Sequence, residues 1–121
     1  PYLQYAYARI ASVQDKYREQ FPAAKLDAWP IRLTEPLERR LVLRLARFPG
    51  VVSGAALACK PNQLCDYLFD LAQTYSSFYQ NVPFLKAAEG VRESRVRLCG
   101  LVARTIKTGL NLLGIETLDR I

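Results

Sequence analysis

The sequence contains no histidine and no methionine among its 121 residues. Without histidine, Ser-His-Asp hydrolysis, Cys-His proteolysis and histidine-ligated zinc sites are excluded. The six glycines are scattered and form no phosphate-binding loop. Asp66 and Asp70 stand four residues apart, but without a histidine or an evident pocket we expect them to be surface residues. The sequence thus gives little support to catalysis, and we expect it to bind no cofactor and no metal.

Cysteine is scarce, with three residues at Cys59, Cys65 and Cys99. An odd count without a CxxC pair indicates free thiols in a reducing compartment, so we expect a cytoplasmic protein. Three thiolates are a conceivable zinc site, but their spacing matches no known metal motif, and we expect buried small hydrophobes instead. No apolar run approaches the roughly 20 residues that span a bilayer, so no membrane partner is expected.

The size and charge of the chain fit one basic domain over residues 1–121. Its 13.7 kDa is typical of a single domain, and 50% hydrophobic residues argue against disorder. The net charge of +6 favours an anionic partner such as nucleic acid. The chain opens at Pro1 without an initiator methionine, so we expect a fragment or a processed product.

Apolar residues recur at helical spacing along nearly the whole chain, and no strand alternation competes. In the first segment Leu3, Ala6, Ile10, Val13 and Tyr17 fall within about an 80° arc, which forms one buried stripe. The predicted fold class is all-α, a helical bundle of four long helices plus one short helix. We expect the long helices at 2–20, 35–48, 62–81 and 93–113, the short helix at 51–58, and loops at 21–33 and 86–93.

Particular residues mark the expected ends of these helices. Thr34 is a candidate N-cap of the second helix, and Pro49-Gly50 is expected to end it. Gly114 is suited to the position just after the last helix. Trp29 is expected to anchor the first loop against the bundle.

One face of the first helix combines aromatic and basic side chains. Tyr2, Tyr5 and Arg9 are spaced three and four residues apart, within about a 60° arc, and Ser12 and Lys16 continue this face. Such a face suits unstacked nucleic-acid bases, because rings stack on bases and arginine pairs with a phosphate or a base edge. The alternative is that the tyrosines seal the rim of the core while Arg9 is solvated. Spacing alone favours this alternative.

Two rows of basic residues are candidates for sequence-independent phosphate contacts. For each row taken alone, an ordinary solvated helix face is a better interpretation than phosphate binding. The rows are Arg40, Arg44 and Arg47 on the second helix, and Arg97, Arg104 and Lys107 on the last.

Four blocks of sequence resemble one family in order and spacing. The opening PYLQYAYARI of residues 1–10 closely resembles the start of the C-terminal anticodon-binding domain of arginyl-tRNA synthetases, called the DALR domain. LARFPGVV at 45–52 is similar to the family's FPxVV corner, and GLNLLGI at 109–115 to its GLxLLGI. LCDYLFDLA at 64–72, followed by Phe78-Tyr79, is similar to its YLxDLA…FY helix. The resemblance covers essentially all 121 residues.

The resemblance implies a helical bundle that grips the tRNA anticodon loop. The family residues that contact anticodon bases correspond here to Tyr2, Tyr5, Arg9 and Tyr79, and the extreme C-terminal residue, here Ile121, also takes part. This agrees with the face derived from spacing and reverses the preference for a sealed core rim. The chain departs from the family at Tyr7, where histidine is frequent, and at Ile121, where methionine is common.

The resemblance also implies that amino-acid activation lies outside this chain. The family's ATP-binding HIGH signature needs histidine, and its KMSKS-like signature normally includes methionine; this chain has neither residue. The parent would be an arginine–tRNA ligase, a class I synthetase that uses ATP in an upstream Rossmann-type domain. The expected partners are an arginine tRNA and that catalytic domain. The fragment itself is expected to be monomeric and to bind without catalysing.

Two alternatives from other classes stay open. One is a DALR-type module of another synthetase or of a non-catalytic tRNA-binding protein, which the upstream sequence would distinguish. The other is a helical protein-interaction module without an RNA role. That module would self-associate independently of salt, which sizing at two salt concentrations would detect.

Overall fold

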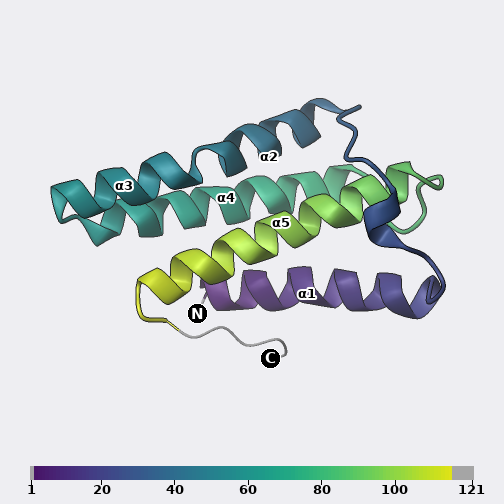
Figure 1. Cartoon of the computed structure of the whole chain (residues 1–121), viewed down its shortest axis with the longest axis horizontal. Helices are drawn as coiled ribbons and strands as arrows, with labels where there is room; N and C mark the ends of the chain where they lie inside the picture. The colour runs from purple at the N-terminus through teal and green to yellow at the C-terminus, as the bar shows by residue number, and fades with distance from the viewer. Residues whose placement is uncertain (1, 116–121) are drawn as a thin grey trace.

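The chain is described by a computed structural model over residues 2–115, and this part contains helices and no strand. The helices α1 and α5 pack together, α5 also packs along α4, and α2 and α3 follow one another along α4 (Figure 1). The predicted all-α bundle is therefore confirmed. Its elements are α1 (Tyr2–Gln20), the 3₁₀ turn η1 (Leu26–Ala28), α2 (Pro36–Ala46), α3 (Phe48–Ala58), α4 (Pro61–Asn81) and α5 (Val91–Leu112).

The core lies where α1, α2, α4 and α5 meet. Ile10, Leu41, Leu68, Phe78 and Ile106 are fully buried there. α1 and α4 run in the same direction along the bundle, and α5 runs antiparallel to both (Figure 1). This arrangement places the start of α1 near the end of α5, and it sets one side of α1 beside α4.

The boundary between α2 and α3 differs from the predicted one. α2 ends at Ala46 and α3 begins at Phe48, so Pro49 and Gly50 lie inside α3 rather than between two helices. Pro49 has no N–H and cannot donate to the carbonyl of Leu45, which interrupts the helical ladder. In the first turn of a new helix that missing donor costs nothing, because the first N–H groups have no helical partner.

The start of α2 also corrects the predicted cap. The N-cap is Glu35, in an extended conformation, because the ring of Pro36 disfavours helical geometry in the preceding residue. Thr34 lies one residue further out, and its hydroxyl donates a 3.2 Å hydrogen bond to the carboxylate of Glu38.

The ends of α5 were predicted with mixed success. Gly114 has a φ of +77°, and the N–H groups of Gly114 and Ile115 donate to the carbonyls of Asn111 and Leu110, which confirms the predicted glycine stop. The polar stretch before α5 is shorter than expected, since the helix begins at Val91. The Glu93 carboxylate accepts the Gly90 N–H at 2.8 Å and thereby starts the helix within that stretch.

The loop after α1 is anchored by Trp29, as predicted. The Trp29 ring carbon Cζ3 lies 3.3 Å from the point that a Cβ on Gly90 would occupy. The Trp29 carbonyl also accepts a hydrogen bond from the Arg97 guanidinium on α5. One aromatic residue thus ties this connection to the start and the body of α5.

The cysteines are free thiols, but only Cys99 is buried. The expectation of burial is wrong for Cys59 and Cys65, which are exposed. Cys59 follows the last residue of α3 with a left-handed φ of 52°, where the chain turns toward α4. Cys65 stands next to the buried Leu64 but on the outer side of α4.

One stretch is more apolar than the sequence analysis expected. The range Pro36–Ala58 is long enough to pass as a membrane span by length and composition alone, because an 18-residue window within it has a mean hydropathy of 1.4. A single such stretch is weak evidence. The whole range Pro36–Ala58 contains four arginines and divides into two helices that pack along α4.

Candidate nucleic-acid interface

A groove runs between α1 and α4, and it gathers four of the five predicted site residues. Tyr2, Tyr5, Arg9 and Tyr79 all line it, whereas Ile121 lies outside the described residues. Its volume is about 230 Å³. The complete lining is Tyr2, Tyr5, Ala6, Arg9, Ser12, Val13, Lys16, Tyr75, Ser76, Tyr79 and Gln80.

The helical repeat of α1 separates the groove-lining tyrosines from the core. Tyr2 and Tyr5 are 44% and 51% exposed, whereas Tyr7 is buried. The buried residues of α1 then continue through Ile10 and Val13. Because α1 turns about 100° per residue, Tyr7 faces away from its aromatic neighbours. Tyr7, where the resemblance implies a frequent histidine, is therefore a core residue in this chain.

Neighbouring rings hold two of the groove tyrosines in place. The Tyr2 ring lies 4.7 Å from that of Phe69, centroid to centroid. The Tyr79 ring is stacked at 6.1 Å from Tyr75 and lies 5.4 Å from Phe84. Tyr79 nevertheless keeps 40% of its surface exposed. Rings fixed in this way lose little conformational entropy when a planar group stacks on them.

The charge of the groove is positive. Arg9 and Lys16 line it, and none of the described lining residues is acidic. The nearest carboxylate in the sequence, Asp15, is paired with Arg18 at 2.9 Å. Burial raises the pKa of the Tyr75 hydroxyl above its ordinary range, and the charge of Arg9 acts in the opposite direction. The groove therefore presents aromatic rings together with two basic side chains.

Two polar residues on the α4 side were not among the site residues predicted from the sequence. Ser76 and Gln80 line the groove beside Tyr79. Their spacing of four residues, with Tyr79 between them, places all three on one face of α4. This pattern was visible in the sequence, but the surrounding aromatic residues indicated a helix that is mostly core, with only one or two side chains projecting outward at its C-terminal end.

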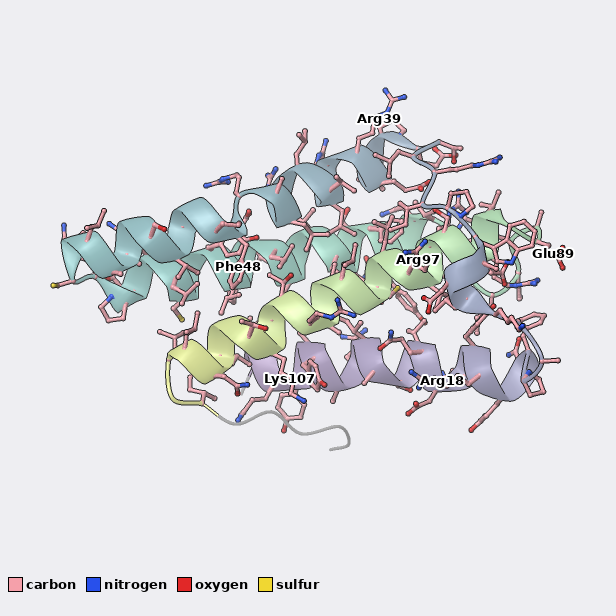
Figure 2. The ribbon with its side chains drawn as sticks, in the orientation of Figure 1. Arg18, Arg39, Phe48, Glu89, Arg97 and Lys107 are labelled. Carbon is pink, nitrogen blue, oxygen red and sulfur yellow. The ribbon has the colours of Figure 1, made fainter. Side chains whose placement is uncertain are left out.

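The two basic rows are divided between structural and exposed roles. The Arg44 Nε lies 2.7 Å from the Asp70 carboxylate, and Arg97 is bound to the Trp29 carbonyl. These arginines are therefore used inside the fold, which corrects their assignment to rows of free cations. Figure 2 shows Arg39 at the outer edge of α2 and Lys107 where α5 lies beside α1. Arg40, Arg47, Arg104 and Lys107 remain exposed.

The described residues do not assemble a metal centre or a carboxylate dyad. No group of three or more His, Cys, Asp or Glu side chains is placed to hold a metal within residues 2–115. Asp66 is exposed, and Asp70 forms an ion pair with Arg44. The arrangement is suited to binding flat and anionic groups.

Known proteins are similar to this chain in sequence and in fold. The sequence profile of the DALR anticodon binding domain matches residues 3–121. The chain belongs to this family. This DALR domain is 47% identical over 120 residues to an arginine–tRNA ligase of Synechocystis sp. and 46% identical over 125 residues to one of Proteus mirabilis. Each match covers 99% of this chain, and the DALR domain spans only 20% of the length of these relatives.

Solved structures agree with the helical arrangement. The arginyl-tRNA synthetase of Thermus thermophilus matches the DALR domain with a TM-score of 0.85 and 36% identity, over 100% of this chain and 21% of that one. The arginyl-tRNA synthetase of Plasmodium falciparum matches 99% of this chain and 21% of its own at 24% identity, with a TM-score of 0.78, and shows the fold alone.

Proposed function

We propose that this DALR domain recognises the anticodon loop of an arginine tRNA as the C-terminal domain of an arginyl-tRNA synthetase. The observation that carries the proposal is the groove between α1 and α4, where Tyr2, Tyr5, Arg9 and Tyr79 meet. Membership of an anticodon-binding family and the names of the relatives support the same partner.

The proposed mechanism is capture of bases that leave the stack of the loop. Tyr2, Tyr5 and Tyr79 stack on or wall these bases, and Arg9 donates hydrogen bonds to a base edge or a phosphate. Stacking on an aromatic ring contributes on the order of 1–3 kcal/mol per base. Ile121 completes the site in this proposal with an apolar contact.

The rest of the longer protein supplies the reaction. In this proposal arginine is ligated to its tRNA, with ATP, in the part of the synthetase that lies outside this chain. The DALR domain supplies binding and packs against that catalytic part. The exposed cations of α2 and α5 add a salt-dependent attraction that does not depend on base sequence. We further propose a monomeric domain in a cytoplasmic enzyme.

The test is binding of the chain to an arginine tRNA and to the same tRNA with an altered central anticodon base, each at low and moderate salt. Base recognition predicts a preference for the native anticodon that persists as salt rises, because stacking and base-edge contacts are less salt-sensitive than phosphate contacts. Equal binding to both RNAs that disappears with salt would contradict recognition of the anticodon by this groove.

A further inference from the structure

A second hollow continues the groove toward the connection between α4 and α5. The two hollows share Val13, Lys16, Tyr79 and Gln80, so they form one continuous depression. The second has a volume of about 370 Å³, which is in the range of small-ligand sites. Its remaining lining comes from the end of α4 and the residues after it, Asn81, Val82, Pro83, Phe84, Leu85 and Lys86.

Two lysines give this second hollow a positive charge. Lys16 lines both hollows, so it lies where they join. Lys86, which follows Tyr79 in the sequence, lines only the second hollow. Within the described chain, no acidic side chain lines the hollow. Glu89, the next carboxylate along the chain, lies at the end of the bundle and outside the lining (Figure 2). Two lysines, with no acidic side chain among the described lining residues, favour an anionic occupant.

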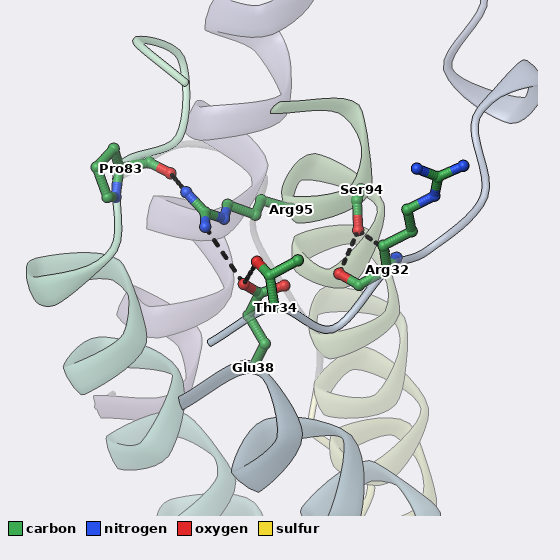
Figure 3. A network of polar contacts seen from close by, with 6 residues as sticks. All are labelled: Arg32, Thr34, Glu38, Pro83, Ser94 and Arg95. Carbon is green, nitrogen blue, oxygen red and sulfur yellow. Dashed lines mark hydrogen bonds and ion pairs between the residues drawn. The ribbon is translucent and has the colours of Figure 1, made fainter. Parts of the chain in front are cut away.

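The wall that carries Lys86 is fixed to the core. The Pro83 carbonyl accepts a 2.7 Å hydrogen bond from the buried guanidinium of Arg95, as Figure 3 shows. The buried Phe84 ring lies 4.8 Å from that of Phe78 and 5.4 Å from that of Tyr79. The hollow therefore exists before a ligand arrives, so binding does not have to order this segment.

We propose that this hollow is a subsite for the RNA backbone, in which Lys16 and Lys86 contact phosphates of the nucleotides next to the captured bases. The inference rests on the proposed function and extends the RNA path from Tyr79 toward Lys86. Lysine recognises a phosphate as a point charge and reads no base. The subsite thus strengthens binding of any anticodon, while the tyrosines of the first groove select among anticodons.

The test compares Lys16→Gln and Lys86→Gln with Lys25→Gln and Lys60→Gln. The control lysines are also exposed, but they line neither hollow. The probe is an RNA hairpin with the anticodon arm of an arginine tRNA, in native form and with an altered central base. We expect each subsite variant to weaken binding several-fold at low salt, equally for both hairpins. Each should also reduce the slope of log affinity against log salt by about 0.7, the value for one single-strand phosphate contact.

The outcomes separate this inference from the function on which it rests. If the wild-type chain prefers the native hairpin but the subsite variants behave like the controls, the subsite is wrong and the proposed function stands. If a subsite variant changes the preference between hairpins, its lysine contacts a base, which also overturns the inference. A wild-type chain that binds both hairpins equally or neither contradicts the proposed function and the subsite together. Far-UV circular dichroism checks that each variant is folded.

Discussion

The Glu38 carboxylate and the Arg95 guanidinium form an ion pair inside the bundle, with 3.3 Å between Oε1 and Nη2 (Figure 3). Their side chains are only 1% and 7% exposed. Arg95 also donates to the Pro83 carbonyl, so one buried cation joins the start of α2 to the wall beside the groove. The Arg95 Nε has no hydrogen-bond partner among the described atoms. The buried charge of Arg95 is therefore compensated by the Glu38 carboxylate and the Pro83 carbonyl.

We expect Glu38→Ala to destabilise the chain by about 3–5 kcal/mol, because it leaves the Arg95 charge buried and unpaired. Chemical denaturation measures this change in the free energy of unfolding. The double variant Glu38→Ala/Arg95→Met removes the stranded charge and should recover part of the loss. A double variant less stable than Glu38→Ala would show that the stranded charge is not the cause.

Glu93 makes the stability of the bundle depend on pH. Burial by itself raises its pKa, but hydrogen bonds from the Gly90 N–H, the Tyr17 hydroxyl and the Arg92 guanidinium outweigh burial and leave the pKa below the ordinary 4.5. The unfolded chain therefore takes up this proton first as pH falls. The stabilisation is complete above pH 4.5 and is lost as pH decreases through the lower folded-state pKa.

The variant Glu93→Gln should lose about 1–3 kcal/mol at neutral pH, because charge-assisted hydrogen bonds are replaced by neutral ones. The difference from wild type should shrink in acid. Urea denaturation over a pH series measures it, with the exposed Glu89→Gln as the matched control. A difference that is constant with pH would contradict the role of the Glu93 charge.

Gly109 of α5 packs closely against Leu68 of α4. A Cβ at this position would lie 2.7 Å from the Leu68 methyl carbons, which belong to a fully buried side chain. We expect Gly109→Ala to cost about 1–3 kcal/mol through overpacking. In the same helix, a Cβ at Gly100 would meet only the flexible end of the Gln14 side chain. The higher helix propensity of alanine should therefore outweigh this contact in Gly100→Ala, and stability should be unchanged or higher. Thermal unfolding compares the two variants, and equal effects would contradict the close approach.

Tyr5 is the most exposed of the four tyrosines that line the groove, so its replacement isolates binding from stability. We expect Tyr5→Ala to weaken binding of an arginine tRNA by about 1–3 kcal/mol, the contribution of one stacked base, while leaving the melting temperature nearly unchanged. Tyr5→Phe retains the ring and should retain most of the affinity. Unchanged tRNA affinity in a folded Tyr5→Ala chain would count against the proposed site.

Pattern alone determined the helical class and the position of the candidate face. A helix turns by a fixed angle per residue, so the spacing of Tyr2, Tyr5 and Arg9 defines a shared side of α1 in any helical structure. The glycine stop at Gly114 was equally predictable, because glycine is the usual residue in the left-handed conformation after a helix. These features depend on neighbours along the chain.

Tertiary structure decided which of the polar and aromatic residues are available. In the sequence, Arg44 and Arg97 look like members of exposed basic rows. In the fold, Arg44 is bound to the Asp70 carboxylate and Arg97 donates a hydrogen bond to the Trp29 carbonyl. The approach of α4 to α1 brings Tyr79 to the groove and sets Lys86 beyond it. The spacing of residues along a helix fixes only the directions in which its own side chains point around the helix axis. Contacts between helices depend on side-chain volumes and buried partners that lie far apart in the sequence, which is why only the assembled bundle reveals the groove.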